Sequence, residues 1–191
     1  MKKLSFLLTG IFFLASLNLA VAASYNTYLG SFNNVYVYSN GTPGYVSGQT
    51  NNVNGYITGY KWQCVEFVNK YFWLKFGRKI AGGNANTYYA NASGKNLNKA
   101  ANGGTNKPQV GNILASNGGS YGHVAIIRSV PSTPSTGTYT IYVAQQNFTE
   151  TTQDVSYPIS MKVTKDSAGA LHYTVSGFSS SYPVQGWMWP K

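Results

Sequence analysis

One stretch of the chain repeats apolar side chains with the period of an α-helix, and this stretch constrains the fold more than any other feature. Residues 62–76 read WQCVEFVNKYFWLKF. Five of them recur at the helical intervals i, i+3, i+4, i+7 and i+8 and share one face: Cys64, Phe67, Val68, Tyr71 and Phe72. Gly77 follows where helix ends favour glycine. The pattern predicts one helix that packs through this face, with Cys64 in its first turn.

The rest of the chain carries strand and turn patterns. Runs of β-forming residues predict strands over 35–38, 122–127, 138–144, 160–163 and 172–175, with another beginning within 110–113. The run 122–127 is apolar on both faces, which indicates a central strand, and the turn after it predicts an antiparallel hairpin with 138–144. Most of 24–55 and 81–110 is rich in Asn, Gly and Ser and is interpreted as loop. Residues 186–189 are expected to pack in the core. The fold class is therefore α+β.

The first residues are typical of an export signal. Lys2 and Lys3 precede a largely apolar run, and residues 20–22 form a small-x-small cleavage site. The apolar run is shorter than the roughly 20 residues that a membrane span needs. We therefore expect residues 1–22 to be removed, and residues 23–191 to act as one catalytic domain in the periplasm or outside the cell.

The composition combines few charges with a basic balance. Without Lys2 and Lys3, 12 of the 14 basic residues remain against 4 acidic ones, a formal charge of +8. This charge suits an anionic polymer surface such as cell-wall material, although it is equally compatible with simple solubility. No dense Lys/Arg run or nucleic-acid motif occurs, so nucleic acid is not an expected partner. We expect a monomer without a cofactor.

Cys64 is the chain's one cysteine, so it cannot form an internal disulfide. A helix N-terminus favours a thiolate, and a histidine beside it could accept the thiol proton. His123 opens the expected central strand, whereas His172 lies among polar neighbours. The alternatives are a small buried thiol and a core histidine. Cys64, His123 and His172 do not have the spacing of a known zinc site, so no metal is expected.

A catalytic histidine needs a third group that holds its ring and tautomer. Residues 145–147, which follow the second strand of the hairpin, read QQN. Period-two alternation puts Gln145 and Asn147 on one face and Gln146 on the other. Either Gln145 or Asn147 could accept the second ring N–H.

Three blocks resemble a known family. Residues 59–67 (GYKWQCVEF), 121–126 (YGHVAI) and 145–147 (QQN) are similar to the signature blocks of the CHAP family of cysteine, histidine-dependent amidohydrolases and peptidases. The resemblance runs from about Tyr28 to Trp187. The first block and residues 186–188 are most similar to the amidase domain of glutathionylspermidine synthetase/amidase.

The resemblance implies a papain-like fold, with Cys64 as the nucleophile and His123 as general base and acid. It implies that Gln63 and the Cys64 N–H lie near the oxyanion, with Tyr60 and Trp62 beside the substrate. The family often has Glu-Gln-Asn in the third block. Here Gln145 replaces the carboxylate, which puts the strength of the base in question.

The four acidic residues of the chain are candidates for the missing carboxylate. Glu66 is expected to favour the helix N-terminus or to pair with a base. Glu150 could fold back towards the histidine, although loop residues beyond a strand are poorly placed for this. Asp154 and Asp166 lie in turn-like sequence and are expected to be solvated.

The predicted function is hydrolysis of an amide bond through a thioester, with cell-wall peptide as substrate. A small-molecule amidase similar to that acting on glutathionylspermidine is an alternative, but that substrate is cytosolic and the export signal argues against it. A catalytically weak wall-binding module and acyl transfer to an amine also remain open.

Overall fold

The computed structural model describes residues 21–42, 44–80, 82–132 and 134–191. The predicted signal peptide therefore lies outside the described residues except for Val21 and Ala22. The strands of the described part are β1 (Tyr28–Phe32), β2 (Val35–Tyr38), β3 (Thr50–Val53), β4 (Tyr56–Tyr60), β5 (Leu97–Ala101), β6 (Ile113–Ser116), β7 (His123–Ser129), β8 (Gly137–Ala144), β9 (Tyr157–Lys165), β10 (Leu171–Val175) and β11 (Val184–Pro190). The helices are α1 (Cys64–Phe76) and the short 3₁₀ turns η1 (Ala85–Thr87), η2 (Ser93–Lys95) and η3 (Thr152–Val155).

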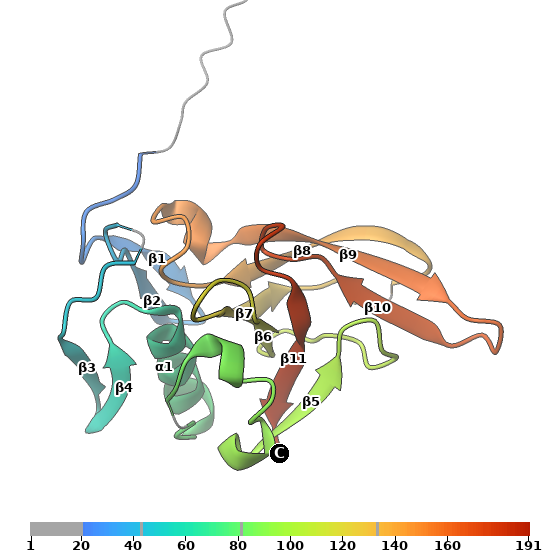
Figure 1. The fold of residues 1–191 in the computed structure, drawn as a ribbon, viewed down its shortest axis with the longest axis horizontal. Coiled ribbons are helices and arrows are strands. Elements are labelled where there is room, and N and C mark those ends of the chain that lie inside the picture. Colours follow the sequence, from blue (N-terminus) through green and yellow to red (C-terminus); the bar gives the residue numbers. More distant parts are fainter. Residues whose placement is uncertain (1–20, 43, 81, 133) are drawn as a thin grey trace, which may run out of the picture.

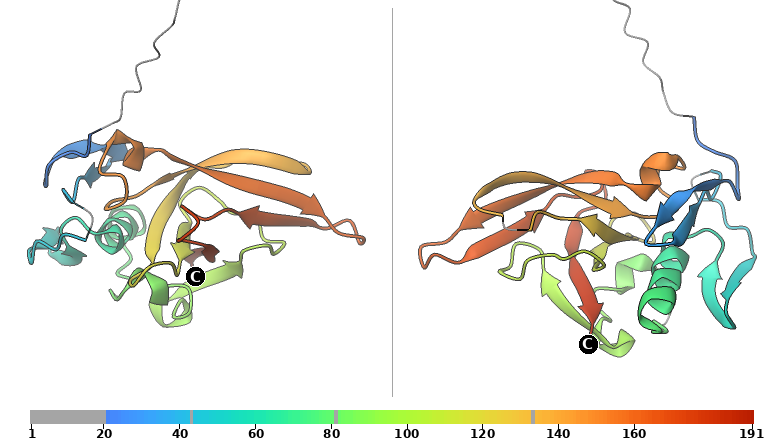
Figure 2. Two further views of the ribbon diagram at one scale, coloured as in Figure 1. Left: turned by 45° about the horizontal axis from the view of Figure 1, so that its top comes forward. Right: turned by 180° about the vertical axis from the view of Figure 1, so that it is seen from behind.

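Seven of the strands form one antiparallel sheet in the order β10-β9-β8-β7-β6-β11-β5. Two hairpins, β1-β2 and β3-β4, lie outside it. Figure 1 shows α1 beside β7 at one end of the molecule, while β8, β9 and β10 extend away as a long twisted ribbon. The views in Figure 2 show the same arrangement. The α+β class and the antiparallel pairing of β7 with β8 confirm the predictions.

The predicted helix is present and packs as its pattern indicates. It begins at Cys64, because Gln63 has the extended conformation of an N-cap (φ −75°, ψ 156°). It ends at Phe76 and is capped by Gly77, whose left-handed φ of 62° lets its N–H donate to carbonyl groups of the last turn. All five residues of the predicted face are buried in one core together with strands β6 and β7. The thiol is thus held at the helix end that meets the sheet.

Strand β7 is central in the sheet, as its two apolar faces predict. Val124 and Ile126 belong to the core beneath α1, whereas Ala125 and Ile127 belong to a second core on the opposite face. This double burial fixes the strand that begins with His123.

The interpretation of residues 24–55 as mostly loop is wrong, because β1 and β3 lie within it, and β4 follows directly after it. These strands have only four or five residues each, and the turns set their pairing. Asn33 and Asn34 both have positive φ (49° and 62°), and Asn54 and Gly55 do likewise (51° and 79°). Asn-Asn and Asn-Gly are favoured in two-residue hairpin turns of this kind. The turn residues were therefore the available signal, since the strands lack apolar alternation.

Candidate active site

Cys64 and His123 line the same cleft, which has a volume of about 880 Å³. Cys64 is 8% exposed. The backbone N–H groups of Cys64, Val65 and Val124 are directed at its sulfur, and they lower the thiol pKa. Because Val124 directly follows His123, the thiol lies against the first residues of β7.

Burial changes the pKa of the Cys64 thiol more than the helix N-terminus does. Desolvation raises the pKa of Cys64 above its ordinary value, and the three N–H groups only partly offset it. The predicted lowering of this pKa is therefore wrong, since burial of the sulfur raises the pKa more than the N–H groups of the helix end lower it.

His123 begins β7 at a point where the chain needs glycine. Gly122 has φ 72°, and a Cβ there would lie 2.4 Å from the backbone N of Asn86 and 2.5 Å from the carbonyl O of Ser116. Asn86 N–H donates to the Tyr121 carbonyl at 2.8 Å. The absent side chain thus lets the η1 segment press against the start of β7, which fixes one wall of the cleft.

The His123 ring is enclosed by aromatic side chains. Its centroid lies 4.8 Å from those of Phe148 and Phe178 and 6.4 Å from that of Tyr182. The residue is 3% exposed. Desolvation lowers the pKa of His123 to about 4, and the hydrogen bond to Gln145 opposes this shift. At neutral pH the imidazole is therefore uncharged and can accept a proton.

The structure distinguishes between the two amides that could hold the ring. The Nε2 of His123 lies 2.9 Å from the Oε1 of Gln145. Asn147 instead donates from Nδ2 to the Oε1 of Gln63 at 2.8 Å. The expected alternation stops because β8 ends at Ala144 and Asn147 adopts φ 57°. Gln145 is thus the amide in contact with the histidine.

Gln63 lines the cleft, but its amide is already engaged. Its Nε2 donates to the Oδ1 of Asn40 at 3.2 Å and to the Tyr45 carbonyl at 3.0 Å. An amide nitrogen has two hydrogens, so both have acceptors here. Gln63 can reach an oxyanion only by exchanging one of these acceptors for the substrate.

The two aromatic residues before the nucleophile differ in position. Tyr60 lines the cleft and is 53% exposed, so a substrate can contact it. Trp62 is buried, stacks on Tyr38 with centroids 4.3 Å apart, and donates from Nε1 to Asn26. Trp62 does not line the cleft, so the expectation that it lies beside the substrate is corrected. Its ring packs against the β1-β2 hairpin instead.

The acidic residues also depart in part from expectation. Glu66 pairs with Lys70 at 3.2 Å, as one of its two expected roles requires. Glu150 accepts hydrogen bonds from Ser39 and from the Asn40 N–H and has none to His123. Asp154, expected to be solvated, has 0% exposure. Its turn is folded under the end of β8, which turn-like sequence does not reveal.

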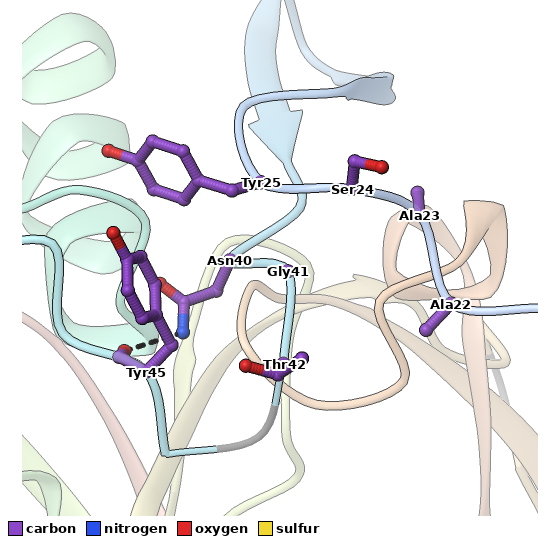
Figure 3. Close-up of a pocket in the computed structure, with 8 residues that line it drawn as sticks. All are labelled: Ala22, Ala23, Ser24, Tyr25, Asn40, Gly41, Thr42 and Tyr45. Carbon is purple, nitrogen blue, oxygen red and sulfur yellow. Dashed lines mark hydrogen bonds between the residues drawn. The ribbon is translucent and has the colours of Figure 1, made fainter.

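Asn40 is a site residue that sequence reasoning missed. It bonds Gln63 and Asn147, and its Nδ2 donates to the Tyr45 carbonyl at 2.8 Å. It also borders a second hollow of about 360 Å³, where residues 22–25 meet the loop from Asn40 to Tyr45 (Figure 3). Its sequence context, between Ser39 and Gly41, indicates only a turn, so no sequence signal marked it.

Neither a metal site nor a membrane span emerges from the described ranges. No group of three His, Cys, Asp or Glu side chains within them could hold an ion. None of the helices there has the length and apolar composition needed to cross a bilayer.

A helix that begins at a cleft cysteine and packs on an antiparallel sheet carrying a histidine defines a papain-like α+β protein. The model of the CHAP domain family matches residues 55–147, a segment that contains Cys64, His123 and Gln145. The chain therefore carries a CHAP domain, which implies a hydrolase of the amidase or peptidase type. None of the curated proteins compared with the chain matches it.

Proposed function

We propose that the chain is an exported cysteine amidase or peptidase that hydrolyses amide bonds in cell-wall peptides through a thioester. The observation that carries this proposal is the uncharged His123 ring, fixed by Gln145 in the same cleft as the one thiol of the chain. A thiol and a neutral imidazole together supply a nucleophile and the base that it needs.

The chemistry follows from the position of the two ring nitrogens. Nε2 is bonded to Gln145, so Nδ1 is the nitrogen left to accept the proton of Cys64. The sulfur attacks the amide carbon as this proton moves to Nδ1, and a tetrahedral intermediate forms. The intermediate collapses as the same proton passes to the leaving amine, which gives an acyl-enzyme thioester. Water then adds with His123 again as base, the carboxylic acid leaves, and the thiol is restored.

The negative oxygen of the intermediate requires hydrogen-bond donors that are in place before reaction. The N–H groups of Cys64 and Val65 are suited to this role, because they belong to the first turn of α1 and are directed at the sulfur. Gln63 would contribute by releasing the Asn40 or Tyr45 oxygen.

Cell-wall peptide is the favoured substrate for two reasons. The predicted export signal supports a location at the wall, and the formal charge of +8 supports an anionic polymer as substrate. The lining of the cleft includes five glycines and four tyrosines, Tyr56, Tyr60, Tyr121 and Tyr182, and such a lining suits an extended chain of small residues.

The test compares the two histidines. Purified residues 23–191 are incubated with peptidoglycan and with glutathionylspermidine, and released amino groups are measured. We expect release from the wall, no activity in Cys64→Ser, and a loss of roughly 10²–10⁴-fold in His123→Ala. His172→Ala is the matched control and should retain full activity, because His172 bonds Gly103 and Asp166 at the surface.

Each alternative has its own outcome. Release from the small amide alone would replace the proposal with a small-molecule amidase. Wall binding without release, together with alkylation of Cys64 by iodoacetamide at equal rates in the parent and His123→Ala proteins, would indicate a binding module. An added amine that captures the acyl group faster than water does would indicate acyl transfer.

A further inference from the structure

A buried carboxylate lies directly behind the amide that holds His123. Gln145 accepts from His123 at Oε1 and donates from Nε2 to the Oδ1 of Asp154 at 3.1 Å. Gln145 and Asp154 both have 0% exposure. Their backbones are joined as well, since Gln145 N–H donates to the Asp154 carbonyl at 2.8 Å. The three side chains form one row from the cleft into the protein.

Asp154 is surrounded by hydrogen-bond donors. Thr149 donates to it from its backbone N–H at 3.0 Å and from its hydroxyl at 2.9 Å, and the Glu150 N–H donates at 2.9 Å. Burial raises the pKa of Asp154, and the hydrogen bonds from these donors and Gln145 oppose the shift. Both carboxylate oxygens accept hydrogen bonds from these groups, which is the arrangement of an ionised carboxylate. The Glu150 carboxylate is close enough to Asp154 for their like charges to interact. The Arg128 guanidinium donates to the carbonyl of the adjacent Val155 at 3.0 Å.

An ionised carboxylate can only accept hydrogen bonds. The Gln145 amide must therefore turn its NH₂ towards Asp154 and its oxygen towards His123. An amide oxygen also only accepts, so the facing Nε2 of His123 must carry the ring proton. Nδ1 is then left with a free lone pair, which is the form that a base needs.

We propose that Asp154 is a positioning residue that acts through Gln145 to hold His123 in its Nε2–H tautomer. This inference rests on the proposed role of His123 as base. Gln145 alone could turn either end of its amide towards the ring, because the two orientations occupy nearly the same space. Asp154 removes this ambiguity, and its negative charge lies behind Gln145, the position where the family often has a carboxylate.

The tautomer can be measured directly, without substrate. The chain has two histidines, so ¹⁵N NMR of the ring nitrogens, assigned with His172→Gln, reports His123 alone. We expect a protonated Nε2 and an unprotonated Nδ1 at neutral pH. In Asp154→Asn the Nε2–H form should lose population, and kcat should fall roughly 10- to 100-fold, the range seen when outer groups that orient a metal-bound histidine are removed. KM should be unchanged, because Asp154 does not line the cleft.

A charge exchange tests the same idea by rescue. Gln145→Glu alone puts two carboxylates about 3 Å apart and should be nearly inactive. In the double variant Gln145→Glu/Asp154→Asn, the new amide can donate to the new carboxylate, which still accepts from His123. Activity and the Nε2–H tautomer should return at least tenfold above either single variant. Asp166→Asn is the matched control, since Asp166 contacts the surface residue His172 and the backbone of its own turn.

The outcomes separate this inference from the proposed function. An Nδ1–H tautomer in the parent protein, or Asp154→Asn with unchanged tautomer and kcat, overturns the inference while leaving the cysteine hydrolase intact. If Asp154→Asn does not fold, the double variant decides: a folded double variant without rescue overturns the inference. A parent protein without activity overturns the proposed function, whereas the tautomer measurement still applies.

Discussion

Acidification should destabilise this protein through His123, and the size of the effect follows from the enclosure of its ring. The pKa of an unfolded histidine is about 6.5, and that of His123 in the folded protein is lowered to about 4. Below pH 6.5 the unfolded chain binds a proton that the native ring excludes, so acid favours unfolding. The stability contribution is complete above pH 6.5 and is lost as the pH falls towards 4.

The magnitude comes from the difference between the two pKa values. Each pKa unit corresponds to about 1.36 kcal/mol. At pH 4.0 the native ring is half protonated, so the loss relative to pH 7.5 is about 3 kcal/mol. Urea unfolding followed by tryptophan fluorescence at both pH values measures it. His123→Gln has no titrating ring and should lose about 3 kcal/mol less than the parent protein.

The comparison isolates His123 from the other titrating groups. Glu150 and Asp154, whose pKa values are raised by burial, titrate in both proteins and cancel. The control His172→Gln should lose at least as much stability as the parent protein between pH 7.5 and pH 4.0. The bond to Asp166 raises the pKa of His172, so protonation of this residue favours the folded state. Equal losses in the parent and His123→Gln would refute the argument that the aromatic enclosure keeps this imidazole neutral.

Three further substitutions test separate parts of the site. Gly122→Ala should cost roughly 2–4 kcal/mol in urea unfolding and lower kcat, because its Cβ would collide with the Asn86 backbone at a left-handed φ; a stability within 0.5 kcal/mol of the parent would contradict this. Lys70→Met should cost roughly 3–5 kcal/mol, since it leaves the Glu66 carboxylate buried without its cation, and Glu66→Gln/Lys70→Met should recover much of that loss. Asn147→Ala should lower kcat while the His123 tautomer stays unchanged in the NMR spectrum; a changed tautomer would show that Asn147 also holds the ring.

The elements that sequence could predict are those whose burial pattern repeats within one segment. The apolar face of α1 and the doubly apolar β7 both follow from local periodicity, because each packs against a large part of the core. β5 (LNKAA) has no such pattern. It pairs with β11 at the sheet edge, so its existence depends on a partner nearly 90 residues away in the chain. Local propensity cannot report such pairing.

The same limit applies to the site. Cys64, His123 and Gln145 lie in or directly after regular elements, and their residue types already indicate chemistry. Asn40 follows β2 and Asp154 lies in the short turn η3, where each bonds an amide of the site. Nothing in their own sequence surroundings distinguishes them from solvated turn residues. The thiol pKa was missed for a related reason, because a helix N-terminus is visible in sequence whereas the depth of burial is not.

The positions of the four acidic residues explain why the chain has so few of them at its surface. Three of the four are buried, and each holds an amide near the cleft: Glu66 accepts from Gln146, Glu150 from the Asn40 N–H, and Asp154 from Gln145. Asp166 is the exposed one, and it pairs with His172. The carboxylates thus stabilise the site from inside, while the surface is left with a strong excess of positive charge. The burial of three of the four acidic side chains thus gives the exterior its basic character.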